Sequence, residues 1–491
     1  MARRTPSPQS PPQGDPPTDR GAAAGAGSPL ETQGRTPLIT GRALVQTVRH
    51  FFPDFNTWLG RLPDTRVQEA CTYDRRFLAW WGLHLYLLQL GSRRQLDFEL
   101  RDGGPKVLTN LNRLAGTTQT TLPVHDTLDH FIGHGSLTGW ERLRTLCVGR
   151  LLRMKALDAA RLLGQPVLLL DATGVICFHR RHCEHCLTQR HGHTTLYLHH
   201  VLEAKLLGPG GVVVSLGSEF IENGDAAAAR GKSADEIKQD CELKAAQRLL
   251  PRIKKDYPQL RFVLALDNLY ACGTLFALAE QLNWSFVVTF KEGRTPVLWR
   301  EYQALLPLCP TNTLTRMWKD GRVQQFRWVN QLEYQDSEGR WWKLDALECT
   351  ERTANGSEHY FAWLTGLPVG QKTVEEIAQK GGRYRWKIEN EGFNRQKNSG
   401  LNLQHVYSTD PENWKIYYLL LQIAFLLMQL LERGSLLRRL AAEAGRPFWK
   451  LFGSLKNVAR RLLDSVRFVA WEEWWFDPAE ARKIRIELDT S

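Results

Sequence analysis

The sequence predicts an α/β core flanked by helical regions, and three patterns support this fold class. Between residues 166 and 294, short apolar runs ending in Asp171 and Asp267 alternate with helical patterns, which is typical of buried strands and their connecting helices. Residues 295–368 alternate polar and apolar side chains, which indicates a β-rich insertion into that core. Before and after these segments, leucines and aromatic residues recur at three- and four-residue spacing, as they do in helices.

The chain begins with a segment that we expect to be disordered. Residues 1–37 hold eight of the 23 prolines, no aromatic residue, and only Met1 and Leu30 as large apolar side chains. Such a segment cannot bury enough surface to offset its ordering entropy. Residues 38–165 are predicted to form an all-helical region, because apolar side chains follow helical spacing in stretches such as Ala70–Leu90.

The first part of the core is predicted to cover residues 166–294. Its expected strands and helices can be assigned from the apolar runs and the turn signals between them. Strands are expected at Val167–Leu170, Leu196–Leu207, Val212–Leu216, Arg261–Leu266 and Trp284–Phe290, and helices at Ala234–Leu250 and Gly273–Leu282.

The insertion at 295–368 carries the turn dipeptides Asp320-Gly321 and Glu338-Gly339 between its alternating stretches. The second part of the core, 369–410, is expected to contain a helix that bears Glu389. Residues 411–491 are predicted to form a helical C-terminal region.

One apolar stretch in the C-terminal region, Tyr417–Leu431, could be mistaken for a membrane span. It is interrupted by two glutamines and falls short of the ~20 apolar residues that a bilayer requires. We therefore expect a buried core helix and no membrane partner.

The charge distribution predicts a polyanionic partner. The chain has 64 Lys and Arg against 52 Asp and Glu, a formal net charge of +12. Residues 38–170 carry 17 basic and 11 acidic side chains, and residues 378–461 carry 15 basic and six acidic ones. The excess of positive charge therefore lies on both sides of the segment that holds Asp171 and Asp267. This pattern favours nucleic acid over a membrane surface. Nine scattered cysteines and no secretory signal favour a reducing, cytoplasmic location.

Three acids are candidates for catalysis. Asp171 and Asp267 each follow an apolar strand directly, and Glu389 lies on a basic helix late in the chain. Carboxylates are ligands that Mg²⁺ and Mn²⁺ prefer, and two such ions can support in-line phosphoryl transfer. If the two strands are neighbours in one sheet, the two Asp side chains can converge.

Three short motifs now carry a family resemblance. Leu168–Gly174 (LLLDATG), Leu264–Tyr270 (LALDNLY) and Arg385–Phe393 (RWKIENEGF) resemble the DDE transposases of bacterial insertion sequences. The resemblance covers about residues 165–435. Within this family, the sequence resembles most specifically the class with a β-strand insertion between the second Asp and the Glu.

This resemblance implies a ribonuclease-H-like mixed sheet and two Mg²⁺ or Mn²⁺ ions held by Asp171, Asp267 and Glu389. It also implies metal-dependent cleavage at the ends of a mobile element and strand transfer into target DNA. The expected partner is double-stranded DNA, as terminal inverted repeats and as target, bound by a homo-oligomer in the bacterial cytoplasm. The helical region 38–165 would recognise the repeats.

The third motif departs from the family order, which is Tyr, two residues, Arg, three residues, Glu, six residues, Lys. If Glu389 is the acid, Arg385 fits, but Gly382 occupies the Tyr position. Gln396 then occupies the Lys position, and Lys397 follows one residue late.

If Glu391 is the acid instead, Tyr384 fits, but Lys387 replaces the Arg and Asn398 replaces the Lys. We favour Glu389, because the preceding Arg-Trp-Lys-Ile run resembles the family more closely. Glu391 stays an alternative.

The basic and aromatic residues around this acid are candidates for DNA contact. Arg385 and Lys397 would neutralise phosphates, and Tyr384 or Trp386 would stack on a displaced base. For Arg385 the alternative is an ordinary intrahelical pair with Glu389, and for Trp386 it is core packing.

Two further groups have open interpretations. Cys183 and Cys186 form a CxxC followed by His191 and His193, which could bind Zn²⁺ or could be the polar tip of a hairpin. Asp240 and Glu242, near the helix before Asp267, could approach the metals or lie on a charged helix face.

Two other functions remain possible on the same sequence. One is a structure-selective DNA nuclease, which would cut without joining. The other is a non-catalytic DNA-binding protein descended from such an enzyme.

Overall fold

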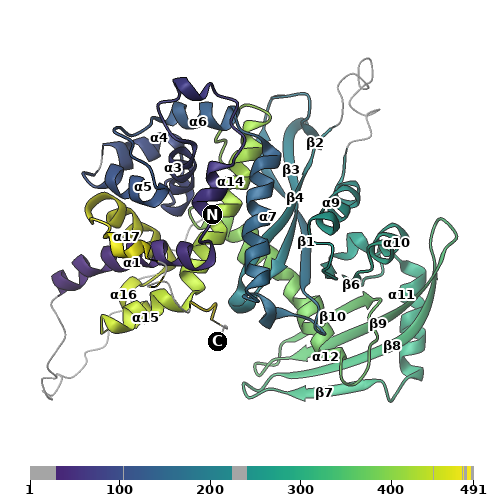
Figure 1. Ribbon diagram of the computed structural model, residues 1–491. Helices are drawn as coiled ribbons and strands as arrows, with labels where there is room; N and C mark the ends of the chain where they lie inside the picture. Colours follow the sequence, from purple (N-terminus) through teal and green to yellow (C-terminus); the bar gives the residue numbers. More distant parts are fainter. Residues whose placement is uncertain are drawn as a thin grey trace, which may run out of the picture.

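The computed structural model describes residues 29–102, 104–223, 240–445, 447–477, 479 and 484–487. Within these residues the chain is a mixed α/β protein, as predicted, with one large sheet and helices around it. Figure 1 shows a helical lobe on one side, the sheet in the middle and a β-rich extension at the far end. The predicted disordered segment lies outside the described residues as far as residue 28.

The sheet has ten strands in the order β2-β3-β1-β5-β6-β10-β9-β8-β7, and β4 pairs with β3 off this path. Strands β1, β5 and β6 are parallel, whereas the other pairings are antiparallel. The strands are β1 (Val167–Phe178), β2 (Leu187–His191), β3 (Thr194–Leu207), β4 (Val213–Ile221), β5 (Val263–Leu266), β6 (Ser285–Thr289), β7 (Thr313–Met317), β8 (Val323–Gln335), β9 (Trp341–Arg352) and β10 (Glu358–Thr365).

The central strands are buried on both faces, which explains their continuous apolar sequences. The parallel connections run through α9 (Glu242–Asp256) and α10 (Gly273–Leu282). Helix α9 lies closer to the C-terminus than the predicted helix Ala234–Leu250. The first six residues of that prediction lie outside the described part of the chain. Strand β4 likewise extends five residues past the predicted end at Leu216.

The insertion is β-rich, as predicted, but it begins with the helix α11 (Pro296–Leu305). Its four strands do not form a separate sheet, because β10 pairs with β6 and so extends the core sheet. Both predicted turns are present, and Gly321 and Gly339 adopt positive φ values of 81° and 80° there.

The chain then crosses the sheet in a series of short, irregular helical elements. They are α12 (Val374–Glu376), η7 (Ile377–Gly382), η8 (Arg383–Trp386), η9 (Ile388–Asn394) and α13 (Arg395–Asn398). Segments η7 and η9 are π-helical, a form that occurs frequently at functional sites.

The N-terminal and C-terminal helices form one lobe rather than two separate regions (Figure 1). The side-chain amide of Asn110 donates hydrogen bonds to the carbonyls of Val466 and Val469, at 3.0 and 2.8 Å. The lobe contains α1 (Pro29–Phe51), α2 (Phe55–Gly60), α3 (Arg75–Leu87), α4 (Arg93–Leu96), α5 (Val107–Ala115), α6 (His125–Gly133), α7 (Leu137–Arg153), α14 (Asn413–Arg433), α15 (Ser435–Glu443), α16 (Phe448–Phe452) and α17 (Leu455–Phe468).

Helix α1 corrects the predicted boundary at residue 38, because it begins at Pro29 inside the segment expected to be disordered. Side chains further along, such as Thr36 and Ala43, are buried in the lobe.

Helix α14 packs against the other helices of the lobe and also against the sheet (Figure 1). It is long and apolar enough to cross a membrane, but the whole of its apolar stretch is buried inside the protein. The prediction of a core helix at Tyr417–Leu431 is therefore confirmed.

Candidate active site

Strand register brings Asp171 and Asp267 side by side, where β5 ends beside the middle of β1. Strand β1 continues past the predicted end at Leu170 to Phe178, so Asp171 lies within the strand rather than after it. In the parallel pair β1 and β5, Leu169 lies opposite Ala265, and both acids follow two residues later on their strands. Neighbouring strands lie about 4.8 Å apart, so the two carboxylates emerge side by side. The Asp267 carboxylate also caps the next turn, where it accepts a hydrogen bond from the Leu269 N–H at 2.8 Å.

Glu389 reaches this cluster from a different element. It lies near the start of η9, which packs against β1. The negative charges of Asp267 and Glu389 both act on Asp171 and raise its pKa. The structure thus brings together the three acids that the sequence singled out.

Glu391, the alternative third acid, lies elsewhere. Its side chain packs against Gly211, in the turn before β4, and pairs with Lys387 at 3.9 Å. Residues two positions apart lie on nearly opposite sides of a helical segment, so Glu389 and Glu391 cannot both face the Asp pair.

Arg385 pairs with one of the acids. Its guanidinium nitrogen lies 3.5 Å from Asp171 Oδ2, and its side chain is only 11% exposed. The guanidinium also stacks 4.7 Å from the ring centroid of Trp386. The structure therefore pairs Arg385 with Asp171.

A fourth carboxylate, Glu242, completes the cluster. It is the first residue of α9, and Tyr270 donates a hydrogen bond to its Oε1 at 2.8 Å. Burial and the nearby charges of Asp171 and Asp267 raise the pKa of Glu242 to about 7. Asp240 is not part of this cluster, because it pairs with Arg248 at 2.6 Å.

Electrostatics make this cluster a suitable cation site. Burial, together with the charges of Asp267 and Glu389, raises the pKa of Asp171 to about 6, although Arg385 opposes the shift. Four carboxylates held together repel one another, and one arginine does not neutralise them. Oxygen donors of this kind match the preference of Mg²⁺ and Mn²⁺, so the residues fit the ions that the sequence implied.

A hollow of about 780 Å³ opens next to Asp267. Its walls combine aromatic rings with cations, and they come from the core, the insertion and the η8 segment. The lining includes Lys291, Trp299, Tyr360, Phe361, Trp363, Arg383, Arg385 and Trp386. Aromatic rings and cations are the groups that hold bases and phosphates.

The remaining DNA-contact candidates lie at different distances from this hollow. Trp386 is 55% exposed, which excludes the core-packing alternative, and it lines the hollow. Tyr384 is exposed and stacks with Lys387. Lys397 lies on α13 close to His200. Gln396, which occupies the family's Lys position, is buried, so Lys397 is the more accessible of these two residues.

The CxxC has a different histidine partner from the two that the sequence suggested. Cys183 Sγ and Cys186 Sγ each lie 3.4 Å from His199 Nε2. His191 and His193 are exposed at the tip of the β2–β3 hairpin. The hairpin register explains this correction: Leu187 lies opposite Leu198, so Cys186 lies across from His199.

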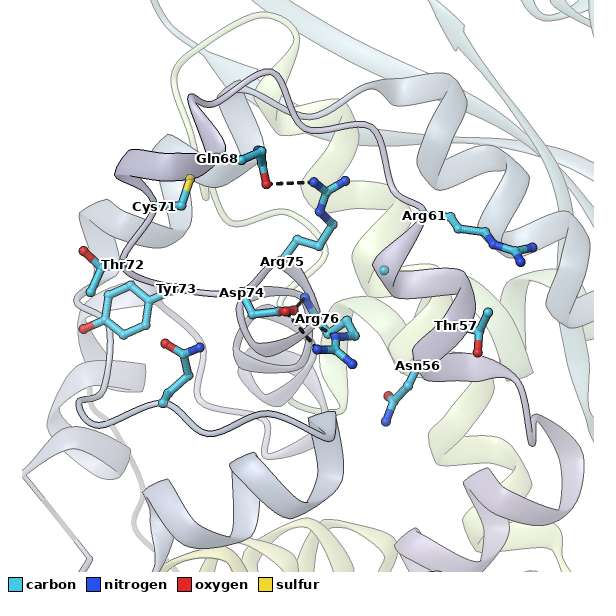
Figure 2. Close-up of a pocket in the computed structure, with 12 residues that line it drawn as sticks. Asn56, Thr57, Arg61, Gln68, Cys71, Thr72, Tyr73, Asp74, Arg75 and Arg76 are labelled. Carbon is cyan, nitrogen blue, oxygen red and sulfur yellow. Dashed lines mark hydrogen bonds and ion pairs between the residues drawn. The ribbon is translucent and has the colours of Figure 1, made fainter.

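A second hollow, of about 740 Å³, lies on the helical lobe away from the acids (Figure 2). Two of its three arginines contact the protein itself. Arg75 donates hydrogen bonds to Gln68 and to the Leu62 carbonyl, both at 2.8 Å, and Arg76 donates to Asp74. Among the described residues of its lining, Arg61 is the third arginine and Asp74 is the one acid.

Comparison with known proteins adds no assignment. No protein-family model matches the chain, and no curated protein matches it.

Proposed function

We propose that the chain is a DDE transposase of the insertion-sequence type, which cleaves DNA at the ends of a mobile element and transfers them into target DNA. The observation that carries this proposal is the convergence of Asp171, Asp267 and Glu389 at the end of β5, beside a hollow of aromatic and cationic side chains. The proposal includes a ribonuclease-H-like core. It is supported by an antiparallel β3 and parallel β5 and β6 around the central strand β1.

Asp171, Asp267 and Glu389 would hold two Mg²⁺ or Mn²⁺ ions, with Glu242 as a neighbouring fourth acid. Bound there, the ions would activate the attacking oxygen and stabilise the leaving one. Mutual repulsion among the carboxylates favours cation binding, because each ion removes an unfavourable interaction.

The protein's own side chains would position the DNA. Arg385 lies 3.5 Å from Asp171 and lines the hollow, so it would meet a phosphate that enters the site. Lys291 lines the same hollow and would hold a flanking phosphate, whereas Arg383 is paired there with Glu351. Trp386, exposed at this hollow, would stack on an unpaired base.

The remaining elements of the proposal follow from the charge distribution. The basic helical lobe would bind terminal inverted repeats, and a homo-oligomer would bring two ends together on DNA in the bacterial cytoplasm. The excess of basic residues in 38–170 and in 378–461 supports this arrangement, since both segments contribute to the lobe or to the edge of the acid cluster.

The test uses duplex oligonucleotides that carry the inverted repeats flanking the coding sequence. We expect the full chain with Mg²⁺ or Mn²⁺ to cleave the repeat end and to join a pre-cleaved end to a target plasmid. Cleavage without joining would support the structure-selective nuclease instead. Binding without cleavage, unaffected by Asp171→Asn, would support a non-catalytic DNA-binding protein.

A further inference from the structure

The second cluster of metal-ligating side chains lies at the far end of β1 from the acids. Cys183 Sγ and Cys186 Sγ are 3.6 Å apart, and each is 3.4 Å from His199 Nε2. His199 pairs with Ile176 on β1, five residues beyond Asp171. At a rise of about 3.3 Å per residue, the two clusters are separated by roughly 16 Å along the strand.

These distances match a tetrahedral metal site. Zinc binds sulfur at about 2.3 Å and imidazole nitrogen at about 2.0–2.1 Å, so two sulfurs on one zinc lie about 3.8 Å apart and a sulfur and a nitrogen about 3.6 Å apart. The three atoms in this protein have almost this spacing, with each pair close enough to share one ion.

A disulfide does not account for the cluster, because it needs its sulfurs about 2.05 Å apart, well below the 3.6 Å found here. Hydrogen bonds can link the three atoms only in a chain, because the single lone pair of a neutral imidazole nitrogen cannot accept from both thiols. A cation between the three atoms satisfies all of them at once.

The surroundings orient the imidazole for this role. His199 is 1% exposed, and its Nε2 faces the sulfurs while its Nδ1 faces Glu222 Oε1 at 3.6 Å. Glu222 is held in turn by Lys415 at 2.8 Å. A carboxylate behind a ligating histidine is a common arrangement at zinc sites, where it fixes the tautomer that leaves the other nitrogen free to bind.

Backbone contacts hold the cysteine loop in place. The side-chain amide of Asn223 donates to the Cys186 carbonyl at 2.9 Å, and the Asn223 N–H donates to the His185 carbonyl at 3.0 Å. The ring of Trp414, at the start of α14, packs 5.2 Å from the His199 ring. The loop thus meets β3, the end of β4 and α14 at one point.

We propose that Cys183, Cys186 and His199 bind one structural Zn²⁺ ion, with a fourth ligand from solvent on the partly exposed Cys183 side. The ion would join the loop before β2 to the sheet and to the start of α14. Binding would release the two thiol protons, since zinc binds cysteine as thiolate. The proposal is independent of the DNA chemistry.

The first experiment measures zinc in the purified full-length chain after desalting. We expect one zinc per chain, also in an Asp171→Asn/Glu389→Gln background, in which the acid cluster is disabled. Cys183→Ser and His199→Gln should each lose the zinc, whereas Cys177→Ser and the pair His191→Gln/His193→Gln should retain it. Zinc well below one per chain, or its loss only from the His191/His193 variant, would overturn the proposal.

The second experiment does not depend on how the variants fold. The metal-free wild-type chain is titrated with Co²⁺, and we expect one equivalent to produce the visible bands of a tetrahedral site and a sulfur-to-cobalt charge-transfer band. Free thiols are then counted after denaturation without reductant. A missing charge-transfer band, or a count two short of the nine cysteines because Cys183 and Cys186 form a disulfide, would refute zinc binding.

Discussion

Replacing Asp171 with asparagine should stabilise the metal-free protein even though it disables the proposed metal site. The pKa of Asp171 is about 6 in the folded chain against an ordinary value of 3.8, so ionisation of this carboxyl opposes folding at neutral pH. Each pKa unit corresponds to about 1.4 kcal/mol, so the penalty at pH 7 is about 3 kcal/mol. Because this shift already includes the attraction of Arg385, asparagine should recover about that amount of stability.

The sign of the pH dependence follows from the raised pKa. The penalty is full above pH 6 and fades as the pH falls through 6 toward 3.8, because the folded form then binds a proton. The advantage of asparagine should therefore fall to roughly half at pH 5.

Denaturant unfolding in EDTA at pH 7 and pH 5 measures this difference. Mg²⁺ or Mn²⁺ should then stabilise the wild type and leave Asp171→Asn almost unchanged. A variant that is less stable than wild type in EDTA at pH 7 would refute the reasoning, because Asp171 would then be a stabilising partner of Arg385 rather than a member of a repelling cluster.

Three further predictions concern other residues. Glu242→Gln should weaken Mn²⁺ binding by ~10–100-fold in a calorimetric titration, as loss of a neighbouring acid does at other metal sites, and an unchanged affinity would exclude Glu242 from the site. Lys205 is fully buried, with Nζ 2.9 Å from Gln422 Oε1 and 3.7 Å from Glu203, so Lys205→Ala should cost ~3–5 kcal/mol of unfolding free energy because it leaves Glu203 unpaired. Lys205→Met/Glu203→Gln should recover most of this loss, and failure to do so would assign the cost to packing. Trp386→Ala should leave the free energy of unfolding within about 0.5 kcal/mol of wild type but reduce DNA cleavage, because it removes the proposed stacking surface. Trp341 is similarly exposed on the insertion, and Trp341→Ala should reduce neither quantity. Equal effects of the two variants on cleavage would rule out a specific base contact.

Much of the core could be predicted because its signals are local. The apolar runs before Asp171 and Asp267 and the turns at Gly321 and Gly339 each depend on a few neighbouring residues. The helical lobe could not be predicted in the same way. Its formation depends on contacts such as Asn110 with Val466, which are 356 residues apart.

The candidate site shows the same division. The two Asp residues follow from strand order and the motif around Glu389 favours it over Glu391, but the place of Glu391 beside Gly211, in the turn before β4, depends on tertiary packing that the sequence does not reveal. In the cysteine cluster, Cys183 and Cys186 could be predicted from the CxxC, but the histidine partner could not. Treating Gly192-His193 as a two-residue hairpin turn would have placed His199 across from Cys186.

The central claim is that Asp171, Asp267 and Glu389 together support metal-dependent DNA cleavage and joining. Its most direct test compares cleavage of a duplex repeat end in Mn²⁺ by wild type, Asp171→Asn, Asp267→Asn, Glu389→Gln and Glu391→Gln. We predict that the first three variants lose cleavage and joining together, while Glu391→Gln keeps both. Cleavage that survives in any of those three, or that is lost only in Glu391→Gln, would contradict the account.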